Sequence, residues 1–240
     1  MTLNDFSAQF DTLLNSYAAI ASFGSTNNPT SVELDEYEKS QFLTKAQEEF
    51  VLSLYNGKNP YGESFEQTEE LRRYLAPLVK EVKLNPIQTS NGMPLGVDSK
   101  SKFFTLPEEL WFITYEAVEI SDGECDSHST QDVFPVRQDE YNKLKKNPFR
   151  GANFRRALRL DLSENNIEII SKYNVTKYYL RYLKKVKPIL LADFGEEAPI
   201  EGYTTAQECE LHEGLHQRIL ELAVRMALQS RGYTVNNENK

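Results

Sequence analysis

The sequence predicts an α+β fold, with helices at the N-terminal end, an antiparallel β-meander in the centre and an amphipathic helix at the C-terminal end. Two patterns lead to this prediction. Apolar residues recur at helical spacing in residues 4–55 and again near the C-terminal end, whereas apolar and polar residues alternate in residues 158–184, as in half-buried strands. We expect a helical region at 1–83, a mainly β region at 84–204, and a last helix with a polar tail at 205–240, packed as one folded unit.

Two helices open the predicted N-terminal region. The first spans residues 4–23, and its apolar stripe is Phe6, Phe10, Leu13, Tyr17 and Ile20. The second spans residues 34–55, and its apolar stripe is Leu43, Ala46, Phe50 and Leu54. Gly57 follows at the position where a glycine commonly ends a helix.

A third helix is expected to begin near Ser64, because Ser64 and Gln67 have the spacing of a capping box. Its apolar stripe continues to about Val82, but Pro77 lies inside it and is expected to kink or shorten the helix, because proline lacks the backbone N–H that a helix interior uses. Only a short loop, residues 56–62, separates it from the second helix. The two helices are therefore predicted to pack as an antiparallel hairpin.

The central region is expected to contain strands. Aromatic and β-branched residues predict a strand at 110–120 and a shorter one at 133–136, followed by a short helix at 139–146. The meander comes next, as three strands within residues 158–184 that are joined by two short Asn-containing turns.

The third strand of the meander is predicted to be half-buried, because its two faces differ. One face carries Lys177, Tyr179 and Arg181. The other face carries Tyr178, Leu180 and Tyr182. A basic face and an aromatic face on one strand indicate a sheet with one side packed on a core.

The last predicted helix begins near Thr205 and ends before a glycine stop, and it carries the run HEGLH at 212–216, which is typical of zinc proteases. On such a helix, two histidines one turn apart bind zinc and the glutamate acts on the bound water. One alternative function is therefore a zinc metallopeptidase, with His212 and His216 as ligands and Glu213 as the general base.

The surroundings of this motif argue against zinc. A catalytic site needs a third protein ligand, and the 24 residues after His216 offer none in a suitable position. Glu208, Glu210 and Arg218 surround the motif with charge. The chain also has no Walker loop, no G-x-S-x-G and no G-x-G-x-x-G. We therefore expect no catalytic residue, no cofactor and no metal site.

The composition is that of a globular protein, with 40% apolar, 26% charged and 11% aromatic residues. The two cysteines are far apart in sequence, which predicts free thiols in a reducing compartment. No apolar run has the length of a membrane-spanning helix, and the first residues lack the pattern of a signal peptide.

The net charge of −9 is unevenly distributed. Residues 137–187 contain 14 Lys or Arg and 5 Asp or Glu, so the remaining residues carry −18. This basic stretch is either a set of solvated strand faces or a surface that meets acidic groups on a neighbour or nucleic acid. An acidic protein binds DNA poorly in general, but a local basic stripe can still face DNA.

Three blocks of sequence resemble a known family. They run from Leu34 to Glu49, from Leu106 to Trp111 and from Tyr178 to Ile189, and Cys209-Glu210-Leu211 accompanies them before the last helix. Together they resemble the structural neck proteins of crAss-like tailed bacteriophages over residues 34–230. The resemblance implies a virion protein that forms a closed, dodecameric ring at the head–tail junction and links the portal to the tail. It transfers no catalytic residue.

The partners that the resemblance implies are further copies of this chain, the portal protein and the adjacent neck or tail proteins. Non-specific contact with packaged DNA is also expected, and contact with a membrane is not. The protein would assemble in the host bacterial cytoplasm and reside in the virion. Another capsid or tail structural subunit is the remaining alternative.

A ring with head-to-tail contacts needs two unlike, complementary surfaces on each subunit. We expect the acidic helical region to supply one surface and the basic meander to supply the other. The candidate acidic residues are Asp35, Glu36, Glu38 and Glu48. The candidate basic residues are Lys177, Arg181, Lys184 and Lys185.

Overall fold

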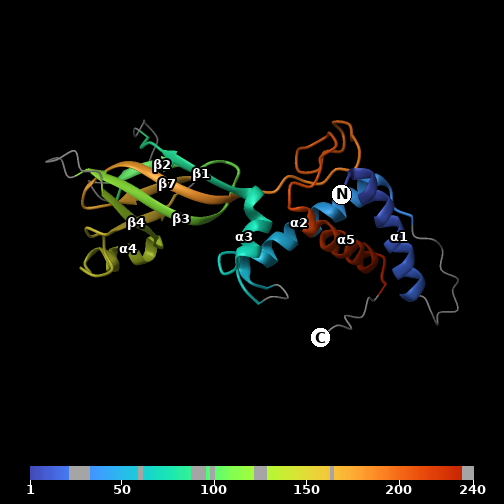
Figure 1. Ribbon diagram of the computed structural model, residues 1–240. Helices are drawn as coiled ribbons and strands as arrows, with labels where there is room; N and C mark the ends of the chain where they lie inside the picture. The colour runs from blue at the N-terminus through green and yellow to red at the C-terminus, as the bar shows by residue number, and fades with distance from the viewer. Residues whose placement is uncertain are drawn as a thin grey trace. The chain divides into compact units, whose positions relative to one another are not determined.

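The computed structural model describes residues 1–21, 33–58, 62–87, 96–97, 101–121, 129–162 and 165–233. They contain five α-helices and a seven-stranded, mostly antiparallel sheet, which confirms the predicted α+β class. The chain divides into two compact units (Figure 1). The helical unit comprises Met1–Leu78 and Val186–Lys240, and the sheet unit comprises Val79–Lys185. The sheet unit is thus inserted in sequence between the two parts of the helical unit. The division at residues 83 and 204 stays a prediction.

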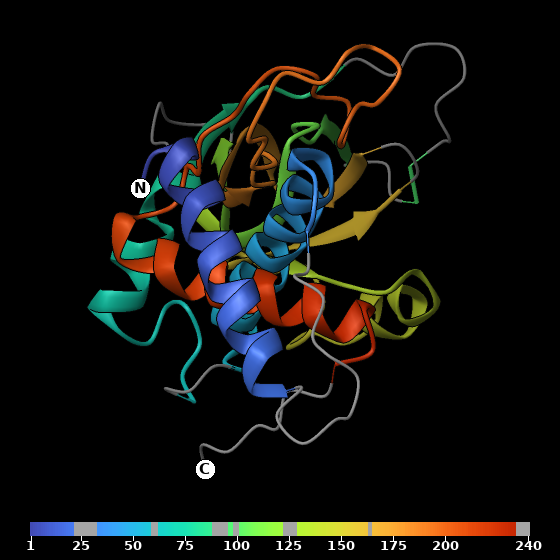
Figure 2. The same cartoon turned by 90° about the vertical axis from the view of Figure 1, so that its right-hand side faces the viewer.

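Three helices form the core of the helical unit: α1 (Leu3–Ala21), α2 (Glu36–Asn56) and α5 (His216–Ser230). Helix α5 packs against both α1 and α2, and Figures 1 and 2 show it beside them. The predicted stripe of α2 is buried, and α5 faces it with Ile219, Leu220, Ala223 and Val224. In α1 the buried face runs through Phe6, Phe10, Leu14 and Ala18, so the predicted stripe is wrong at Leu13 and Tyr17, which are only half-buried. No helix among the described residues has the length and apolarity needed to cross a bilayer.

The ends of α2 and α5 follow from their capping residues. Asp35 caps α2, because its Oδ1 accepts a hydrogen bond from the Glu38 backbone N–H at 2.7 Å. Gly57 ends α2 with φ of 72°, a left-handed conformation that glycine adopts without a steric cost. Gly232 does the same after α5, with φ of 83°. Both predicted helix stops are confirmed.

The predicted third helix is wrong at both ends, because residues 64–68 precede the helix and residues 79–82 belong to a strand. Helix α3 spans only Glu69–Leu75, a 3₁₀ turn follows at Ala76–Leu78, and Val79–Leu84 forms strand β1. The cap is Thr68, whose Oγ1 accepts from the backbone N–H of Leu71 at 3.3 Å. Pairing of β1 with another strand outweighs the helical spacing of its apolar residues. The predicted hairpin is also wrong, because α2 packs mainly with α5.

The sheet unit contains strands in the order β1-β7-β3-β4-β5-β6-β2. Beyond β1, these are β2 (Lys102–Thr105), β3 (Leu110–Ser121), β4 (Ser129–Pro135), β5 (Arg156–Asp161), β6 (Asn166–Ile170) and β7 (Asn174–Lys184). All neighbouring pairs are antiparallel except β4 and β5, which are parallel. Helix α4 (Gln138–Lys145) lies in the connection between these two strands, near its predicted position.

The predicted three-strand meander is only partly correct. Strands β5 and β6 do pair, but β7 lies between β1 and β3 instead of beside β6. The sheet curls, since Ile87 after β1 forms an isolated bridge with Phe103 of β2 at the opposite edge. Only residues 171–173 separate β6 from β7. Because the sheet is curled, this short connection can join two strands that are not neighbours in the sheet but face each other across its interior.

The interior of the curled sheet is the main core of this unit. All seven strands contribute to it, and its largest fully buried side chain is that of Tyr178. Leu180 and Tyr182 lie on the same buried face of β7, while Lys177, Tyr179 and Arg181 lie on the outer face, as predicted. On the outside of β5 and β6, Leu158, Leu160 and Ile170 form a second small core with Tyr141 of α4.

The last helix begins later than predicted, at His216, after a 3₁₀ turn at Glu213–Leu215. Residues 190–207 instead form an irregular hairpin, which we call the acidic arm because Asp193, Glu196, Glu197 and Glu201 are exposed on it. Its two sides are hydrogen-bonded at Leu190 and Gln207 and again from the N–H of Phe194 to the carbonyl of Thr204. This pairing satisfies backbone groups that a helix would otherwise satisfy.

Candidate functional site

The HEGLH run does not lie on one helix. His212 has φ of −56° and ψ of 137°, so its backbone is extended. Its Nδ1 accepts a hydrogen bond from the backbone N–H of Gly214 at 3.1 Å, which caps the 3₁₀ turn. His216 is the first residue of α5. The two imidazoles are therefore not presented one turn apart on a single helix face, which is the arrangement that zinc requires of this motif.

Both ring nitrogens of His216 have partners within the chain. The side chain is buried, Nε2 is 3.0 Å from the carbonyl oxygen of Leu211, and Nδ1 is 3.0 Å from the nitrogen of Met1. An ammonium group can only donate, so Nδ1 accepts and Nε2–H donates. Burial lowers the pKa of His216, despite the hydrogen bond to Leu211. Across the described ranges, no group of three or more His, Cys, Asp or Glu side chains is arranged to hold a metal ion.

The acidic interface candidates lie on α2 and at its N-cap, and all four already have partners within the chain. Asp35 and Glu38 form the capping box, and Glu38 also contacts Arg231 Nη2 at 3.2 Å. Glu36 accepts a hydrogen bond from Ser7 Oγ at 2.7 Å. Glu48 also has a partner within the chain. As contact residues for a neighbouring protein, these carboxylates would have to exchange or share their present partners.

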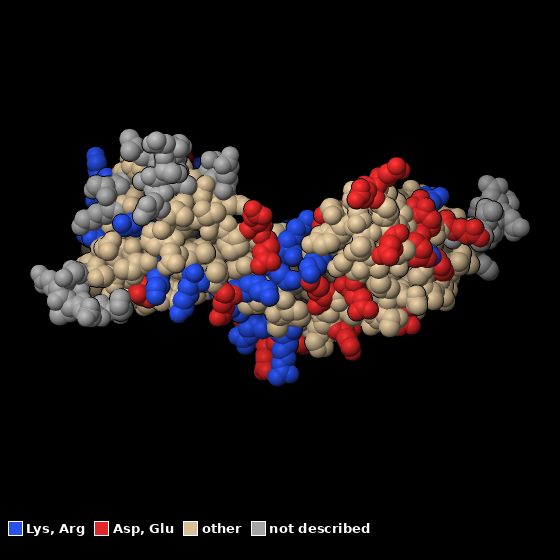
Figure 3. Space-filling model, turned by 90° about the horizontal axis from the view of Figure 1, so that it is seen from above, with Lys and Arg blue, Asp and Glu red and all other residues tan. Residues whose placement is uncertain are grey.

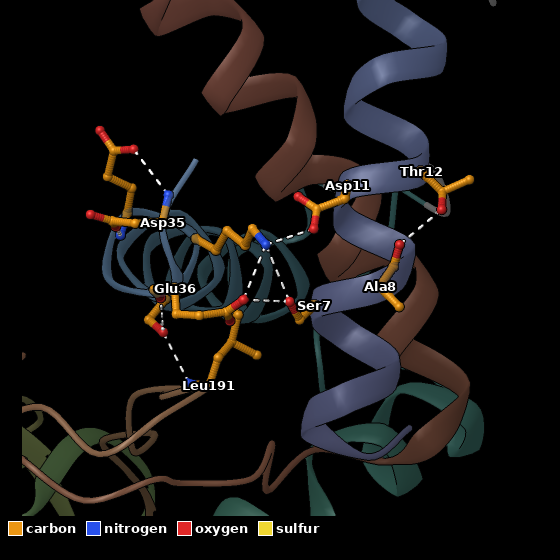
Figure 4. A network of polar contacts seen from close by, with 10 residues as sticks. Ser7, Ala8, Asp11, Thr12, Asp35, Glu36 and Leu191 are labelled. Atoms are coloured by element: carbon orange, nitrogen blue, oxygen red, sulfur yellow. Dashed lines mark hydrogen bonds and ion pairs between the residues drawn. The ribbon is translucent and has the colours of Figure 1, made fainter. Parts of the chain in front are cut away.

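A polar network joins Ser7 and Asp11 of α1 to Glu36 of α2 (Figure 4). Lys39 of α2 contributes its amine to this network. Its Nζ lies 2.7 Å from Asp11 Oδ2, 3.2 Å from Glu36 Oε1 and 3.2 Å from Ser7 Oγ. The residue is only 4% exposed. Burial lowers the pKa of Lys39, but the hydrogen bonds to Asp11 and Glu36 outweigh burial, and the net shift is upward. The amine is therefore charged, and it holds the two helices together.

A buried polar stripe on α2 was not found from the sequence. Ser40, Thr44 and Gln47 are spaced to lie on one face of the helix, and all three are buried. The stripe fixes the start of the acidic arm and the residues just before it. Ser40 Oγ bonds with Leu191 N (2.9 Å), Thr44 Oγ1 with Ile189 N (3.2 Å) and Gln47 Nε2 with Lys187 O (2.7 Å). The spacing of three hydroxyl or amide residues at i, i+4 and i+7 is the only sequence signal for it.

The same stripe holds the other end of the acidic arm. Cys209 Sγ donates to Gln47 Oε1 at 3.2 Å. Burial raises the pKa of the Cys209 thiol to about 11, so the thiol stays protonated and can donate. Cys209 is a free cysteine, as predicted, and Cys125 lies outside the described residues. The acidic arm is therefore anchored to α2 at both of its ends.

The basic interface candidates follow the outer face and the end of β7. Lys177 is exposed, and Arg181 is half-buried, with Nε 3.7 Å from Glu81 Oε1. Lys184 and Lys185 both have partners within the chain. Arg181 also lines an open cavity of about 390 Å³, together with Tyr115 of β3 and with residues of β1 and β7. The structure thus brings these four residues to one strand and its end.

A second basic surface, absent from the predicted candidates, lies on the connection from α4 to β5. We call it the Phe/Arg loop and define it as residues 147–156. Phe149 is 84% exposed and Phe154 is 62% exposed. The guanidinium carbon of Arg155 lies 5.0 Å from the ring centre of Phe154, and that of Arg156 lies 4.0 Å from the ring centre of Phe134. Three arginines in seven residues were visible in the sequence, but the exposure of the phenylalanines was not.

Arg159 lies on the inner face of β5. Its neighbours Leu158 and Leu160 face outward to α4, so Arg159 points into the interior, where its Nη1 lies 2.9 and 2.8 Å from the two carboxylate oxygens of Glu116. Tyr178 donates to the same carboxylate at 2.7 Å. Burial raises the pKa of Glu116, against the opposing effect of Arg159. This arginine is structural and is not a surface cation.

The two units differ in charge. The helical unit contains 21 acidic and 10 basic residues, whereas the sheet unit contains 15 acidic and 17 basic residues. Figure 3 shows acidic side chains spread over the surface of the helical unit, which is drawn on the right. The basic excess of residues 137–187 is partly balanced by acidic residues in the first part of the sheet unit. The chain therefore contains one strongly acidic unit and one nearly neutral unit with a local basic excess.

The amino-acid sequence is similar to those of known phage proteins. A family model for phage tail ring protein 3/4 matches residues 1–239. Ring protein 3 of Bacteroides phage crAss001 is 44% identical over 241 residues, which cover 99% of this chain and all of that protein. Ring protein 4/5 of the same phage is 32% identical over 236 residues, which cover 95% of this chain and 92% of that protein.

These matches place the chain among the structural proteins of the phage virion. The chain belongs to the phage tail ring protein 3/4 family. The resemblance to crAss-like phage proteins seen in the sequence is thereby confirmed.

Proposed function

We propose that this protein forms one closed ring at the junction of the phage head and tail, where it links the portal to the tail. The observation that carries this proposal is the pairing of an acidic helical unit with a locally basic sheet unit in each subunit of a ring protein family. A closed ring with cyclic symmetry joins two different surfaces of each subunit. Unlike charges on these surfaces favour head-to-tail contact and oppose the symmetric pairing of like surfaces.

The ring is proposed to be dodecameric and to contact the portal and the neighbouring neck or tail proteins. Lys177 and Arg181 on the outer face of β7 are candidate contacts on the basic side, together with Lys184 and Lys185. Asp35, Glu36, Glu38 and Glu48 are candidates on the acidic side. DNA passes through such a junction, and the acidic helical unit would repel its phosphates, so contact with DNA is proposed to be weak and non-specific.

The proposed role is structural and involves no reaction. His212 and His216 support this, because one caps a 3₁₀ turn and the other has both ring nitrogens engaged within the chain. Glu213 lies within the 3₁₀ turn and not on a helix beside two ligands. The geometry favours a role for all three residues in stabilising the folded structure.

The proposal is tested by purifying the chain alone and together with the portal protein of its phage. Native mass spectrometry gives the number of subunits, and electron microscopy gives the shape of the assembly. We expect closed rings, alone or on the portal. A chain that stays monomeric under both conditions contradicts the proposal, and an open or helical polymer of the chain indicates a different kind of tail subunit.

A further inference from the structure

We propose that the Phe/Arg loop of one copy, together with Phe134, docks on the acidic arm of the neighbouring copy. This inference rests on the proposed ring and identifies the pair of surfaces that closes it. The loop belongs to the sheet unit and the arm belongs to the helical unit, so the contact is heterologous, as a ring requires.

The Phe/Arg loop exposes more apolar surface than folding alone explains. Six large apolar side chains are well exposed among the described residues, and three of them are Phe134, Phe149 and Phe154. Phe134 and Phe154 line the same shallow cavity of about 450 Å³, together with Pro148. Phe149 follows Pro148 directly. Exposed aromatic residues gathered in this way are typical of protein–protein contact sites.

The loop is held rigid from inside the sheet unit. Gln131 is 1% exposed, and its Nε2 donates to the carbonyl oxygens of both Asn153 and Phe154 at 2.9 Å. Its Oε1 accepts from Ser171 Oγ at 2.7 Å, so the whole amide is engaged. A buried amide that fixes two consecutive carbonyls of an exposed loop sets the position of Phe154 before any partner arrives. A surface that is preorganised in this way loses little conformational entropy on binding.

The turns at the two ends of the loop add to this rigidity. Asn147 Oδ1 accepts from the backbone N–H groups of Phe149 and Arg150 at 2.9 and 3.1 Å. Asn153 Oδ1 accepts from the N–H of Arg155 at 2.9 Å. A Cβ at Gly151 would lie 2.7 Å from the carbonyl oxygen of Asn147, so only glycine fits this close approach. The exposed aromatic rings therefore sit on a defined backbone.

The chemistry of the loop selects a partner that is both acidic and aromatic. Arg155 and Arg156 lie over phenylalanine rings, which keeps the guanidinium groups in place while their N–H edges can reach carboxylates. The acidic arm supplies such groups. Glu196 and Glu197 are exposed near its tip, and Tyr203, which is bridged to Ile200 on the returning side, is 37% exposed. Anchoring of the arm to α2 through Gln47 makes it a defined target as well.

Charge exchange tests the contact directly. One variant carries Arg155→Glu and Arg156→Glu, and a second carries Glu196→Lys and Glu197→Lys. Each places like charges on both proposed surfaces, so we expect each to weaken self-association about tenfold or more, as measured by native mass spectrometry and electron microscopy. A chain that carries all four substitutions has opposite charges again, and we expect it to form rings.

Co-expression of the two variants adds a second test. Each exchanged surface then finds an opposite charge only on the other variant, so we expect rings with alternating subunits. Circular dichroism and thermal unfolding show that the variants are folded. Phe149→Ala with Phe154→Ala, which leaves the charge unchanged, is expected to weaken association as well.

The outcomes separate this inference from the proposed function. If both charge variants form rings as the wild type does, the docking is overturned and the ring stands. If the wild type forms no ring with or without the portal, both are overturned. If the combined chain and the co-expressed pair fail to recover association, the loop and the arm are not partners. If the arginine variant assembles normally but loses DNA binding in a filter assay, the loop faces DNA and the docking is overturned.

Discussion

At the scale of single residues, His216 ties α5 to the beginning of the chain and is held neutral by its surroundings. Its pKa is lowered in the folded protein, chiefly by burial, so the unfolded chain binds a proton more readily. Below the ordinary pKa of about 6.5, protonation therefore favours unfolding. We expect the free energy of unfolding to fall as pH decreases from about 6.5, by at most about 1.4 kcal/mol per pH unit from this residue.

Urea unfolding between pH 7.5 and pH 5 measures this dependence in the wild type and in His216→Gln. The variant is expected to be less stable at neutral pH and to lose part of the pH slope. His212→Gln is the matched control, since His212 belongs to the same motif but caps the turn. An unchanged slope in His216→Gln would show that other groups cause the acid sensitivity.

Lys39 permits a second prediction at this scale. Lys39→Met keeps the length of the buried side chain but leaves Asp11 and Glu36 without their cation. Both carboxylates are nearly half exposed and can be solvated, so we expect a loss of about 1–2 kcal/mol, below the cost of breaking a fully buried pair. Chemical denaturation measures it. Lys45→Met on the exposed side of α2 is the control and should change stability by less than about 0.5 kcal/mol. Equal effects of the two substitutions would contradict the role assigned to Lys39.

At the scale of structural elements, the polar stripe of α2 controls the base of the acidic arm. Gln47→Leu removes the donor to Lys187 O and the acceptor for Cys209 Sγ. A buried carbonyl left without a partner costs about 1–3 kcal/mol. We expect faster hydrogen exchange in residues 187–209, measured by mass spectrometry.

Gln41→Leu is the control for this substitution, because Gln41 is a half-buried glutamine on a different face of α2. It should leave exchange in the acidic arm unchanged. Unaltered exchange in Gln47→Leu would mean that the arm is held by its internal hydrogen bonds alone.

Some of these elements could be predicted from the sequence and others could not. Helix α2 was predictable because its cap, its apolar stripe and its terminal glycine agree. Strand β1 was not, because Val82 continues the helical spacing of Leu75 and Leu78, whereas Val82 and Leu84 also have the spacing of one strand face. Pairing with β7 decides between the two structures. Residues 205–212 were predicted as helix because the helical pattern of α5 was extended backwards through His212, whereas Gln207 pairs with Leu190 across the arm. Long-range pairing leaves no local signal.

The candidate surfaces follow the same rule. The basic residues of β7 were predictable, since alternation along a strand assigns side chains to its two faces. The Phe/Arg loop was not, because burial of Gln131 beneath it and exposure of Phe149 depend on the folded sheet unit. The inward position of Arg159 was not predictable for a related reason. Helix α4 covers Leu158 and Leu160 on the outside of β5, which turns Arg159 inward toward Glu116.

At the scale of the whole molecule, the chain consists of an acidic unit built from its two ends and a sheet unit inserted between them. Two chain segments connect the units, at Leu78 and Val79 and at Lys185 and Val186. This organisation gives each subunit two chemically different bodies, which we propose as the two contact surfaces of a head-to-tail ring.

The charge contrast predicts that assembly depends on salt. Exposed charges are screened within about 8 Å at physiological ionic strength and within about 3 Å at 1 M salt. We expect rings of the purified protein to dissociate more readily at high salt, with the subunits remaining folded. Analytical ultracentrifugation across a salt series measures this. Rings that tighten with added salt would indicate contacts dominated by apolar burial instead.

An image of the intact virion by electron cryomicroscopy tests the central claim most directly. The account predicts a closed ring of this chain between the portal and the tail, with the sheet unit of each copy against the helical unit of the next. Density for this chain at another place in the particle, or in an unclosed arrangement, would contradict it.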